Sequence, residues 1–375
     1  MARLGDVATY INGYAFKPSD WANTGLPIIR IQDLTGNSYQ ANRYNGEYAL
    51  KYEVNDGDVL ISWSASLGVY VWHGEKALLN QHIFKVVFDK TEISKTFFVH
   101  QVENILEKAS VEAHGATMKH LTKPVFDALP FYLPPIDEQR KIAAVLDKVS
   151  DLIAKRRQQL DKLDELVKSR FVEMFGDPII NSMHWMEELI GDSCFVTKLA
   201  GFEYTQYIHY GDSGDVVMVK AQNVKNGKLN RKDLSYISNE VSNSLPRSQL
   251  AAGDVVMTYV GANIGDVAVI DDEYKYHLAP NVAKIRPDAE KYNSVYFMYM
   301  LMFLNSYVVG NSADTAKAAL GMERIRKLKI FTPPIGLQEQ FAAFVAQVDK
   351  SKFAIQKSLQ KLKMLKSALM QEYFR

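Results

Sequence analysis

Side chains that can read DNA bases gather in a few short segments of this sequence. Arginine, lysine, asparagine and glutamine form hydrogen bonds that distinguish base edges in the major groove, whereas serine, threonine and the backbone of glycine loops suit phosphate contacts. In the first half of the chain the candidate DNA-binding residues are Gly13, Tyr14, Lys17, Arg30, Gln32, Ser64, Ser66, Asn80, Gln81, His82, Thr117, Lys119 and His120. In the second half they are Lys198, Tyr204, Lys220, Gln222, Asn223, Tyr259, Asn263, Asn281 and Lys317.

Each of these residues, taken alone, is more simply explained as a turn former or a surface polar group. The set as a whole is more informative, because its members recur at equivalent places in the two halves and differ in type. Arg30 corresponds to Lys220, and His82 corresponds to Asn281. A common scaffold that reads two different DNA targets is the more economical interpretation.

Sequence patterns for catalysis are largely absent. The chain contains no phosphate-binding Gly-x-x-x-x-Gly-Lys-Ser/Thr, no Gly-x-Gly-x-x-Gly after a strand and no His-Glu-x-x-His. It also lacks the Asn-Pro-Pro-Tyr/Phe tetrapeptide with which amino-methyltransferases hold a flipped base. We therefore expect no catalytic residue, no metal site and no cofactor in this chain.

Two other functions stay open at this stage. Glu273 and Lys275 form a Glu-x-Lys that resembles part of a nuclease metal site, although a charged turn between strands explains it more simply. A nuclease fused to a DNA-binding protein would cut DNA with Mg²⁺ through these two residues. The other alternative is a dimeric scaffold without any role on DNA, which footprinting separates from a DNA reader.

The composition is that of an ordinary globular protein. The 375 residues include 47% hydrophobic residues and 44 Lys+Arg against 43 Asp+Glu, which excludes a histone-like polycation but permits local basic faces. Cys194 is the only cysteine, which excludes intrachain disulfides and Cys-based zinc sites. The longest apolar run, residues 295–304, is about half of the ~20 residues that cross a bilayer. We expect a soluble, cytoplasmic protein with no membrane partner.

An internal repeat indicates which elements position the candidate residues. Pro134-Pro135-Ile136 recurs as Pro333-Pro334-Ile335, at an offset of 199 residues, and Gln139 recurs as Gln338 at the same offset. Other matches keep their order along the chain while the offset changes only by loop-sized steps. The chain is therefore a tandem duplication.

Each half contains a globular part followed by a long helix. Short β-rich runs lead to an apolar helical segment, a Pro-Pro pair and then a helical stretch. The expected domains are a first recognition domain at 1–134, a first spacer helix at 135–176, a second recognition domain at 177–333 and a second spacer helix at 334–375. The predicted fold class is α+β, with two similar mixed α/β domains separated by two long helices.

Both long helices have apolar residues at the seven-residue spacing of a coiled coil. The predicted pairing residues are Ile142, Leu146, Val149, Ile153, Leu160, Leu163 and Val167 in the first helix, and Phe341, Val348, Ile355, Leu362 and Leu369 in the second. About 37 residues at ~1.5 Å each give ~55 Å, longer than a domain of this size is wide. We expect an antiparallel coiled coil that relates the domains by a pseudo-twofold axis, rather than helices docked separately on their own domains.

Three segments resemble a known family. They are Met174-Phe175-Gly176-Asp177-Pro178 followed by Asn181 and Trp185, Leu133-Pro134-Pro135-Ile136 with its repeat, and Gly115-Ala116-Thr117 followed by Leu121. Together with the layout of two domains and two helices, they resemble the specificity (S) subunits of type I restriction–modification systems. The resemblance covers essentially the whole chain.

The resemblance implies a function and a set of partners. Each globular domain would read one half of a bipartite, asymmetric site in double-stranded DNA, and the helices would fix the gap between the halves. The chain itself would have no catalytic activity. Two methyltransferase (M) subunits, which use S-adenosylmethionine to methylate adenine, would bind the helices. Two restriction (R) subunits, motor-nucleases that use ATP and Mg, would join for restriction.

Two quantitative expectations follow from that layout. Domains that bind successive major grooves require half-site centres about one helical turn, ~34 Å, apart on one face of the duplex. The formal net charge of +1 predicts weak DNA binding by the isolated chain, because phosphate contacts need basic residues. The methyltransferase subunits would then supply much of the phosphate contact.

Overall fold

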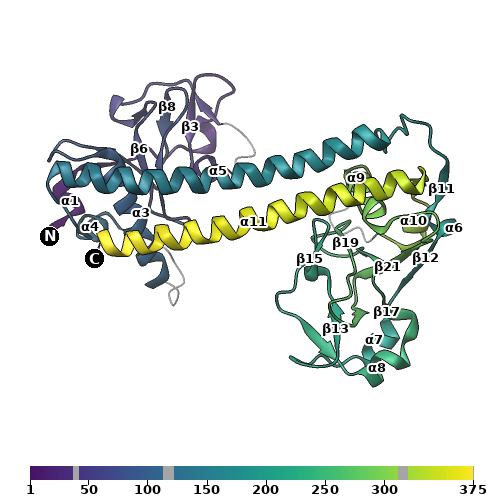
Figure 1. Cartoon of the computed structure of the whole chain (residues 1–375). Coiled ribbons are helices and arrows are strands. Elements are labelled where there is room, and N and C mark those ends of the chain that lie inside the picture. Colours follow the sequence, from purple (N-terminus) through teal and green to yellow (C-terminus); the bar gives the residue numbers. More distant parts are fainter. Residues whose placement is uncertain (37–41, 113–121, 311–319, 375) are drawn as a thin grey trace. The chain divides into compact units, whose positions relative to one another are not determined.

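The chain folds into two compact units, and each unit combines a globular part with segments of two long helices (Figure 1). Unit 1 contains Met1–Gln158 and Gln356–Arg375, and unit 2 contains Gln159–Ile355. The structure, a computed structural model, describes residues 1–36, 42–112, 122–310 and 320–374. Both long helices pass from one unit into the other without a break.

Two kinds of sheet build the globular part of unit 1. The strands are β1 (Ala2–Arg3), β2 (Thr9–Asn12), β3 (Leu26–Ile29), β4 (Arg43–Tyr44), β5 (Glu53–Val54), β6 (Val59–Ser62), β7 (Gly68–Val71), β8 (Ala77–Leu79), β9 (Ile83–Val87) and β10 (Pro130–Phe131). One four-stranded antiparallel sheet has the order β2-β9-β6-β7. A second has the order β4-β3-β8-β5, with β3 and β8 parallel, and β1 pairs with β10.

Unit 2 repeats this arrangement. Its strands are β11 (Glu187–Leu189), β12 (Cys194–Lys198), β13 (Val216–Val219), β14 (Val224–Lys225), β15 (Lys228–Leu229), β16 (Ser235–Ile237), β17 (Gln249–Leu250), β18 (Val255–Thr258), β19 (Val267–Val269), β20 (Tyr276–Leu278), β21 (Val282–Pro287) and β22 (Lys329–Phe331). The sheets follow the orders β12-β21-β18-β19, β16-β13-β20-β17 and β11-β22, and β13 is parallel to β20. The hairpin β14-β15 has no counterpart among the described residues of unit 1.

Helices complete each unit. The α-helices are α1 (Leu4–Val7), α2 (Ile31–Leu34), α3 (Lys95–Glu112), α4 (Lys123–Asp127), α5 (Ile136–Phe175), α6 (Ile190–Ser193), α7 (Gly201–Tyr207), α8 (Asn239–Ser244), α9 (Ser294–Gly310), α10 (Met322–Arg326) and α11 (Ile335–Tyr373). Single 3₁₀ turns occupy Pro18–Asp20, Leu50–Tyr52, Ala221–Asn223 and Pro246–Ser248. None of the helices in the described ranges is long and apolar enough to cross a membrane.

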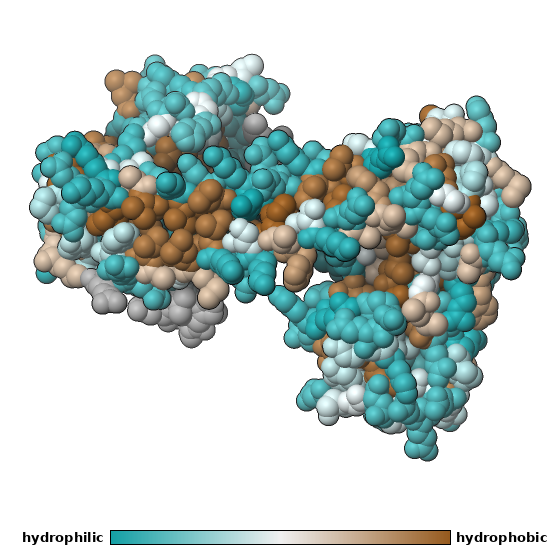
Figure 2. Space-filling view, viewed as in Figure 1, coloured by the Kyte–Doolittle hydropathy of each residue, from teal (hydrophilic) through white to brown (hydrophobic). Residues whose placement is uncertain are grey.

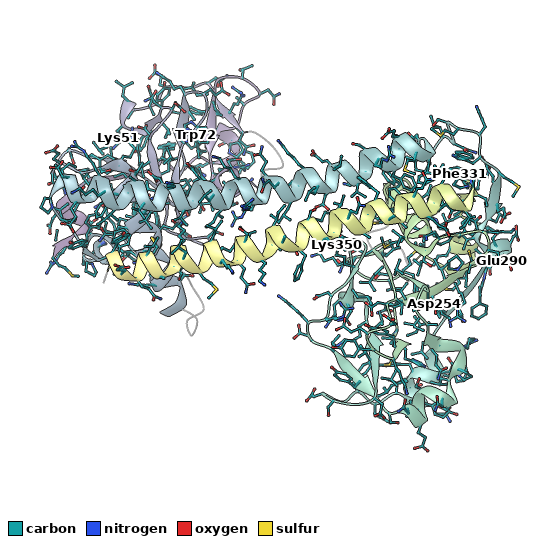
Figure 3. All side chains as sticks on the ribbon, viewed as in Figure 1. Lys51, Trp72, Asp254, Glu290, Phe331 and Lys350 are labelled. Carbon is teal, nitrogen blue, oxygen red and sulfur yellow. The ribbon has the colours of Figure 1, made fainter. Side chains whose placement is uncertain are left out.

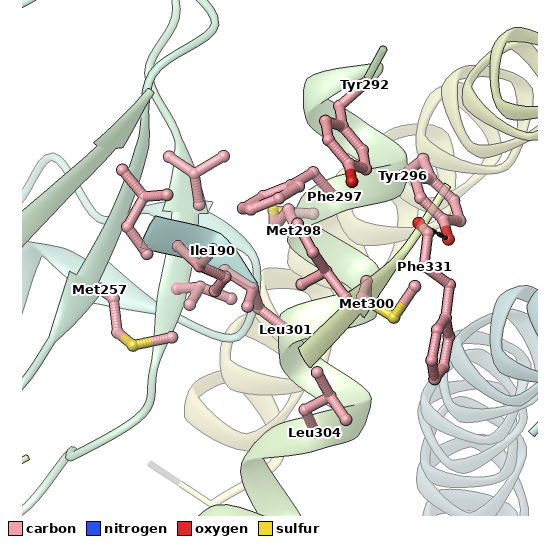
Figure 4. Packing of buried hydrophobic residues seen from close by; sticks show 14 of the residues in the cluster. Ile190, Met257, Tyr292, Tyr296, Phe297, Met298, Met300, Leu301, Leu304 and Phe331 are labelled. Carbon is pink, nitrogen blue, oxygen red and sulfur yellow. Dashed lines mark hydrogen bonds between the residues drawn. The ribbon is translucent and has the colours of Figure 1, made fainter. Parts of the chain in front are cut away.

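Buried strands organise the core in the same way in both units. In β6, Val59 and Ile61 belong to the core cluster that includes α3, while Leu60 faces a smaller cluster between the two sheets. In β18, Val255 and Met257 join the α9 cluster, and the intervening valine joins the second one. A strand buried on both faces in this way reads as a continuous apolar run. Figure 4 shows the unit 2 cluster, where the Tyr296 hydroxyl also donates to the Phe331 carbonyl at 3.1 Å.

A repeated glutamine ties each long helix to its globular part. Gln139 Nε2 donates to the carbonyl of Pro134 at 2.8 Å, and Gln338 Nε2 donates to the carbonyl of Pro333 at 2.8 Å. The Oε1 atom of each glutamine accepts the backbone N–H of a residue just before α3 or α9, at 3.0 and 2.8 Å. Both glutamines are almost completely buried. The same pair of buried glutamine hydrogen bonds therefore fixes the start of each long helix.

The two long helices pack together within each unit. In unit 1, Ile142 and Leu146 near the start of α5 share a core cluster with Met370 near the end of α11. In unit 2, the ring of Phe341 near the start of α11 lies 5.6 Å from that of Phe175 at the end of α5. The start of one helix thus meets the end of the other, which is antiparallel packing. Apolar side chains (brown) gather where the helices run side by side in unit 1 (Figure 2).

The proposed pairing residues differ in burial along the helices. The buried members are Ile142, Leu146, Val149, Ile153, Val167, Phe341 and Val348. The half-buried members are Leu160, Leu163, Ile355, Leu362 and Leu369. At a seam position where the apolar series lapses, Lys352 is buried and its ammonium donates to Asp164 at 2.5 Å.

The α+β fold class with two similar domains and two long helices that pack together is confirmed. The helices begin at Ile136 and Ile335 and end at Phe175 and Tyr373. Both ends of each helix therefore lie within two residues of the expected bounds. The Pro-Pro pair precedes each start, and Gly176, with φ +78°, ends the first helix. Grouping by contacts divides the chain differently from the four expected domains, since each unit contains part of both helices.

Candidate nucleic-acid interface

In unit 1 the candidate segments that the structure describes follow the carboxyl ends of strands. Strands β2 and β6 run in the same direction because both are antiparallel to β9, and β3 is parallel to β8. The loops at 13–17 and 63–66 follow β2 and β6, and those at 30–34 and 80–82 follow β3 and β8. Strands that run in one direction end at one edge of a sheet, so their loops gather there.

Hydrogen bonds join these loops directly. The Tyr14 N–H donates to the Leu79 carbonyl at 2.9 Å, and the Gln81 N–H donates to the Tyr14 carbonyl at 2.8 Å. The Asn80 N–H donates to the carbonyl of the last β3 residue at 3.2 Å. Gly13 permits this approach, because a Cβ at that position would lie 2.0 Å from the Asn80 carbonyl oxygen. The structure therefore brings together segments that are far apart in the sequence.

An aromatic cluster surrounds the first loop of unit 1. The rings of Tyr14 and Phe16 lie 4.9 Å apart, and Tyr44 and Tyr52 lie 5.2 Å from Phe16 and 5.6 Å from Tyr14. Tyr14 is 45% exposed, and the Lys51 ammonium lies 5.0 Å from the Tyr52 ring (Figure 3 labels Lys51). Sequence reasoning missed Tyr44, Tyr52 and Lys51, because they lie outside the segments that match between the two halves of the sequence.

A cation held against an aromatic ring recurs in both units. The Arg30 guanidinium lies 5.8 Å from the Trp21 ring, and the Lys220 ammonium lies 5.9 Å from the Tyr210 ring. Each cation begins a short turn, and its backbone N–H donates to the side chain three residues later: Arg30 to Asp33 at 2.7 Å and Lys220 to Asn223 at 3.1 Å. Sequence reasoning found Arg30 and Lys220 but missed their aromatic partners, which lie nine and ten residues earlier.

Unit 2 joins its loops through equivalent bonds. The Tyr259 N–H donates to the Asn281 carbonyl at 2.9 Å, and the Ala279 N–H donates to the carbonyl of the last β13 residue at 3.2 Å. The Lys198 ammonium lies 5.4 Å from the Tyr259 ring. Burial raises the pKa of the Tyr259 hydroxyl, which keeps this group neutral as a hydrogen-bond donor or acceptor. The Tyr204 ring lies 6.0 Å from the ring of Tyr210, which is the aromatic partner of Lys220.

The candidate residues differ in how accessible they are. The exposed ones are Tyr14, Lys17, Ser66, Lys198, Gln222, Asn263 and Asn281. The half-buried ones are Gly13, Arg30, Gln32, Asn80, Gln81, His82, Tyr204, Lys220 and Tyr259. Ser64 is buried. Thr117, Lys119, His120 and Lys317 lie outside the described residues.

The structure assigns Asn223 an internal role instead. The side chain is 2% exposed, and its amide nitrogen donates to the carbonyls of Asn230 and Lys232 at 2.9 and 3.1 Å. Its Oδ1 atom accepts the Lys220 N–H at 3.1 Å. Every strong hydrogen-bonding group of the side chain is therefore used within the loop, which leaves none for a base.

Glu273 and Lys275 do not form a shared site. The Glu273 carboxylate pairs with Arg231 at 2.9 Å, and the Lys275 ammonium donates to Asn239 at 3.2 Å. Within the described ranges, no group of three or more His, Cys, Asp or Glu side chains is placed to hold a metal ion. The charged turn between strands is the better description of this segment.

Comparison with known proteins gives one consistent match. The family model for the type I restriction modification DNA specificity domain matches residues 1–165 and 196–366. The chain belongs to this family. The type I restriction enzyme EcoBI specificity subunit of Escherichia coli is 24% identical over 391 residues, which cover 96% of this chain and 80% of that protein. The MjaVIII specificity subunit of Methanocaldococcus jannaschii is 22% identical, with 96% and 90% covered.

Solved structures show the same fold in this family. The S subunit of a type I restriction-modification system from M. genitalium aligns with a TM-score of 0.55 and 13% identity, over 100% of this chain and 95% of that chain. A chain from a study of complex assembly and conformational transition in the type I R-M system aligns with a TM-score of 0.58 and 16% identity, over 100% and 97%. The specificity subunit therefore acts in DNA recognition, and a nuclease fusion or a scaffold without a role on DNA is not favoured.

Proposed function

We propose that each unit of this specificity subunit reads one half of a bipartite DNA site in the major groove. The observation that supports this most strongly is the duplicated loop edge, where equivalent strand ends present different side chains in the two units. Arginine, lysine, asparagine, glutamine and histidine at such an edge have the donors and acceptors that distinguish base pairs. Two edges of similar architecture and different chemistry suit two different half-sites.

The long helices set the separation between the half-sites in this proposal. The helix α5 has 40 residues and α11 has 39, and both are continuous from one unit into the other. A paired helix is much stiffer than a flexible linker of the same length, because every backbone hydrogen bond resists bending. Such a spacer favours one gap length between the half-sites over all others.

The outer faces of the helices are the proposed contact with the methyltransferase subunits. In unit 1 they expose Val145, Leu152 and Met364, and in unit 2 they expose Leu166 and Phe353, which is 69% exposed. Large apolar side chains on a helix that has already buried its seam indicate a further binding surface. Two M subunits, one for each half of the duplicated chain, fit this arrangement.

The catalytic work belongs to the partners in this proposal. The M subunits bind S-adenosylmethionine and methylate adenine, and two R subunits that use ATP and Mg add restriction. The chain is the non-catalytic subunit of that complex and acts in the cytoplasm, where the DNA of the cell is found. Its near-neutral charge suits weak DNA binding alone and tight binding once M subunits add phosphate contacts.

Methylation of chromosomal DNA by purified subunits tests the proposal. We expect the M subunits to transfer labelled methyl groups to adenine at defined sites only when this chain is present. Methylation of the same sites by M subunits alone would contradict it. Strong site-specific binding by the isolated chain would contradict the shared-contact part.

A further inference from the structure

Asn12, Trp63 and His82 form a frame in unit 1. The frame lies at the reading edge, by which we mean the edge where the loops after β2, β3, β6 and β8 meet. The Trp63 N–H donates to the His82 carbonyl at 3.2 Å, and the Trp63 indole N–H donates to Asn12 Oδ1 at 3.2 Å. The rings of Trp63 and His82 lie 4.9 Å apart. Because these residues follow β6, end β2 and precede β9, the frame fixes three strand ends relative to one another.

Unit 2 contains the same frame with other side chains. Tyr259 replaces the tryptophan, and its N–H donates to the Asn281 carbonyl at 2.9 Å. Lys198 replaces the asparagine, with its ammonium 5.4 Å from the Tyr259 ring. His82 and Asn281 adopt the same left-handed backbone, with φ of 71° and 70°. Asn12 and Lys198 also occupy the same register: Asn12 pairs with the second residue of β9, and Lys198 pairs with the second residue of β21.

Two side chains that bind the backbone at equivalent places keep their residue type in both copies. Gln139 and Gln338 make the same bonds at the starts of the long helices. Lys85 and Lys284 both donate to the backbone of the edge strand, β5 in unit 1 at 2.5 Å and β17 in unit 2 at 2.8 Å. All three frame positions, in contrast, change type while their backbone bonds stay the same. What differs between the two frames is the chemistry that each presents.

We propose that the frame residues determine which bases each unit reads, an inference that rests on the proposed function. In unit 2, Lys198 suits the O6 and N7 acceptors of guanine, and Asn281 suits adenine. In unit 1, Trp63 occupies Asn12 Oδ1, so the Asn12 amide donates its N–H to a base acceptor beside the His82 imidazole. Trp63 and Tyr259 are positioning residues, since each orients a neighbouring side chain.

Exchanging the residues at the left-handed position tests this directly. H82N and N281H each introduce a residue type that the same backbone conformation already accepts in the other unit, so both variants should fold. Methylated sites are mapped by sequencing the DNA of a host that expresses the complete system. We expect H82N to change the base preference in one half-site only, by about tenfold in relative methylation, and N281H to change the other half-site only. The gap should stay the same.

His73→Asn makes the same chemical change in unit 1 on a highly exposed turn between β7 and β8, and should leave both half-sites unchanged. An unchanged half-site in H82N would show that the frame is only structural and would overturn the inference, while the proposed function would stand. A wild-type system without a bipartite site would contradict the proposed function instead.

If H82N abolishes methylation, DNA binding by the variant complex tests the inference instead. The variant complex is then used to select DNA from a library with a randomised half-site, and an unchanged selected sequence would count against the inference. Trp63→Phe removes the indole donor but keeps an aromatic ring, so it should relax the preference at the base read by Asn12. A lower melting temperature with an unchanged base preference would show that Trp63 stabilises the fold but does not orient the Asn12 side chain toward a base.

Discussion

Removing one heptad from each long helix should shorten the gap between the two half-sites. Deleting residues 156–162 from α5 and 354–360 from α11 removes two turns from each helix and no residue of the four core clusters. Seven residues at ~1.5 Å correspond to ~10.5 Å of helix, or up to ~3 base pairs at ~3.4 Å each. Because the repeat is seven residues, the apolar seam of each helix keeps its face.

The assay is methylation of a DNA library in which the gap varies while both half-sites stay fixed. We expect the doubly shortened chain, assembled with its M subunits, to prefer a gap up to ~3 base pairs shorter and the same half-site sequences. Deletion from α5 alone serves as the matched control, because it shifts one helix against the other and should lower the melting temperature. An unchanged gap preference in the doubly shortened chain would refute the role of the helices as a spacer.

Two further predictions concern stability. Phe341→Ala should lower the free energy of unfolding by about 3–5 kcal/mol, measured by urea titration, because Phe341 is fully buried against Phe171 at 5.4 Å; a loss below about 1 kcal/mol would show that this contact is not part of the core. The His100 imidazole at 3.9 Å and the Lys366 ammonium at 2.8 Å hold the pKa of Glu103 at about 2 instead of 4.5. The contribution of the Glu103 carboxylate to folding stability is therefore fully present above about pH 4.5 and is lost as the pH falls through 2. Glu103→Gln should lower the melting temperature at pH 7, and the difference in melting temperature from the wild type should shrink under acid. Because Glu103 is half exposed, we expect the substitution to lower the free energy of unfolding by less than about 1 kcal/mol. A difference in melting temperature that grows under acid would contradict the lowered pKa.

The sequence predicts the architecture well because duplication makes each motif visible twice. A single Pro-Pro followed by a glutamine could be chance, but two copies at one offset indicate a device that the chain needs in both halves. The structure shows why, since Gln139 and Gln338 satisfy backbone groups that would otherwise be buried without partners. The long helices were predictable for a similar reason, because apolar residues seven apart need a partner helix.

The reading edge was predictable only in outline. The repeated polar segments indicate which loops meet, but not which side chain is presented, since that depends on contacts across strands. Asn223 is an example, because its amide is used by the loop itself and no sequence pattern reveals this. Trp21 and Tyr210 are the opposite case: they are ordinary aromatic residues in the sequence and become relevant only when the fold places Arg30 and Lys220 beside them.

Mapping methylated adenines across the genome of a host that expresses this system tests the central claim most directly. The account predicts one bipartite site, with two different specified half-sites separated by an unspecified gap of fixed length. A single continuous site, or two half-sites that tolerate many gap lengths, would contradict it.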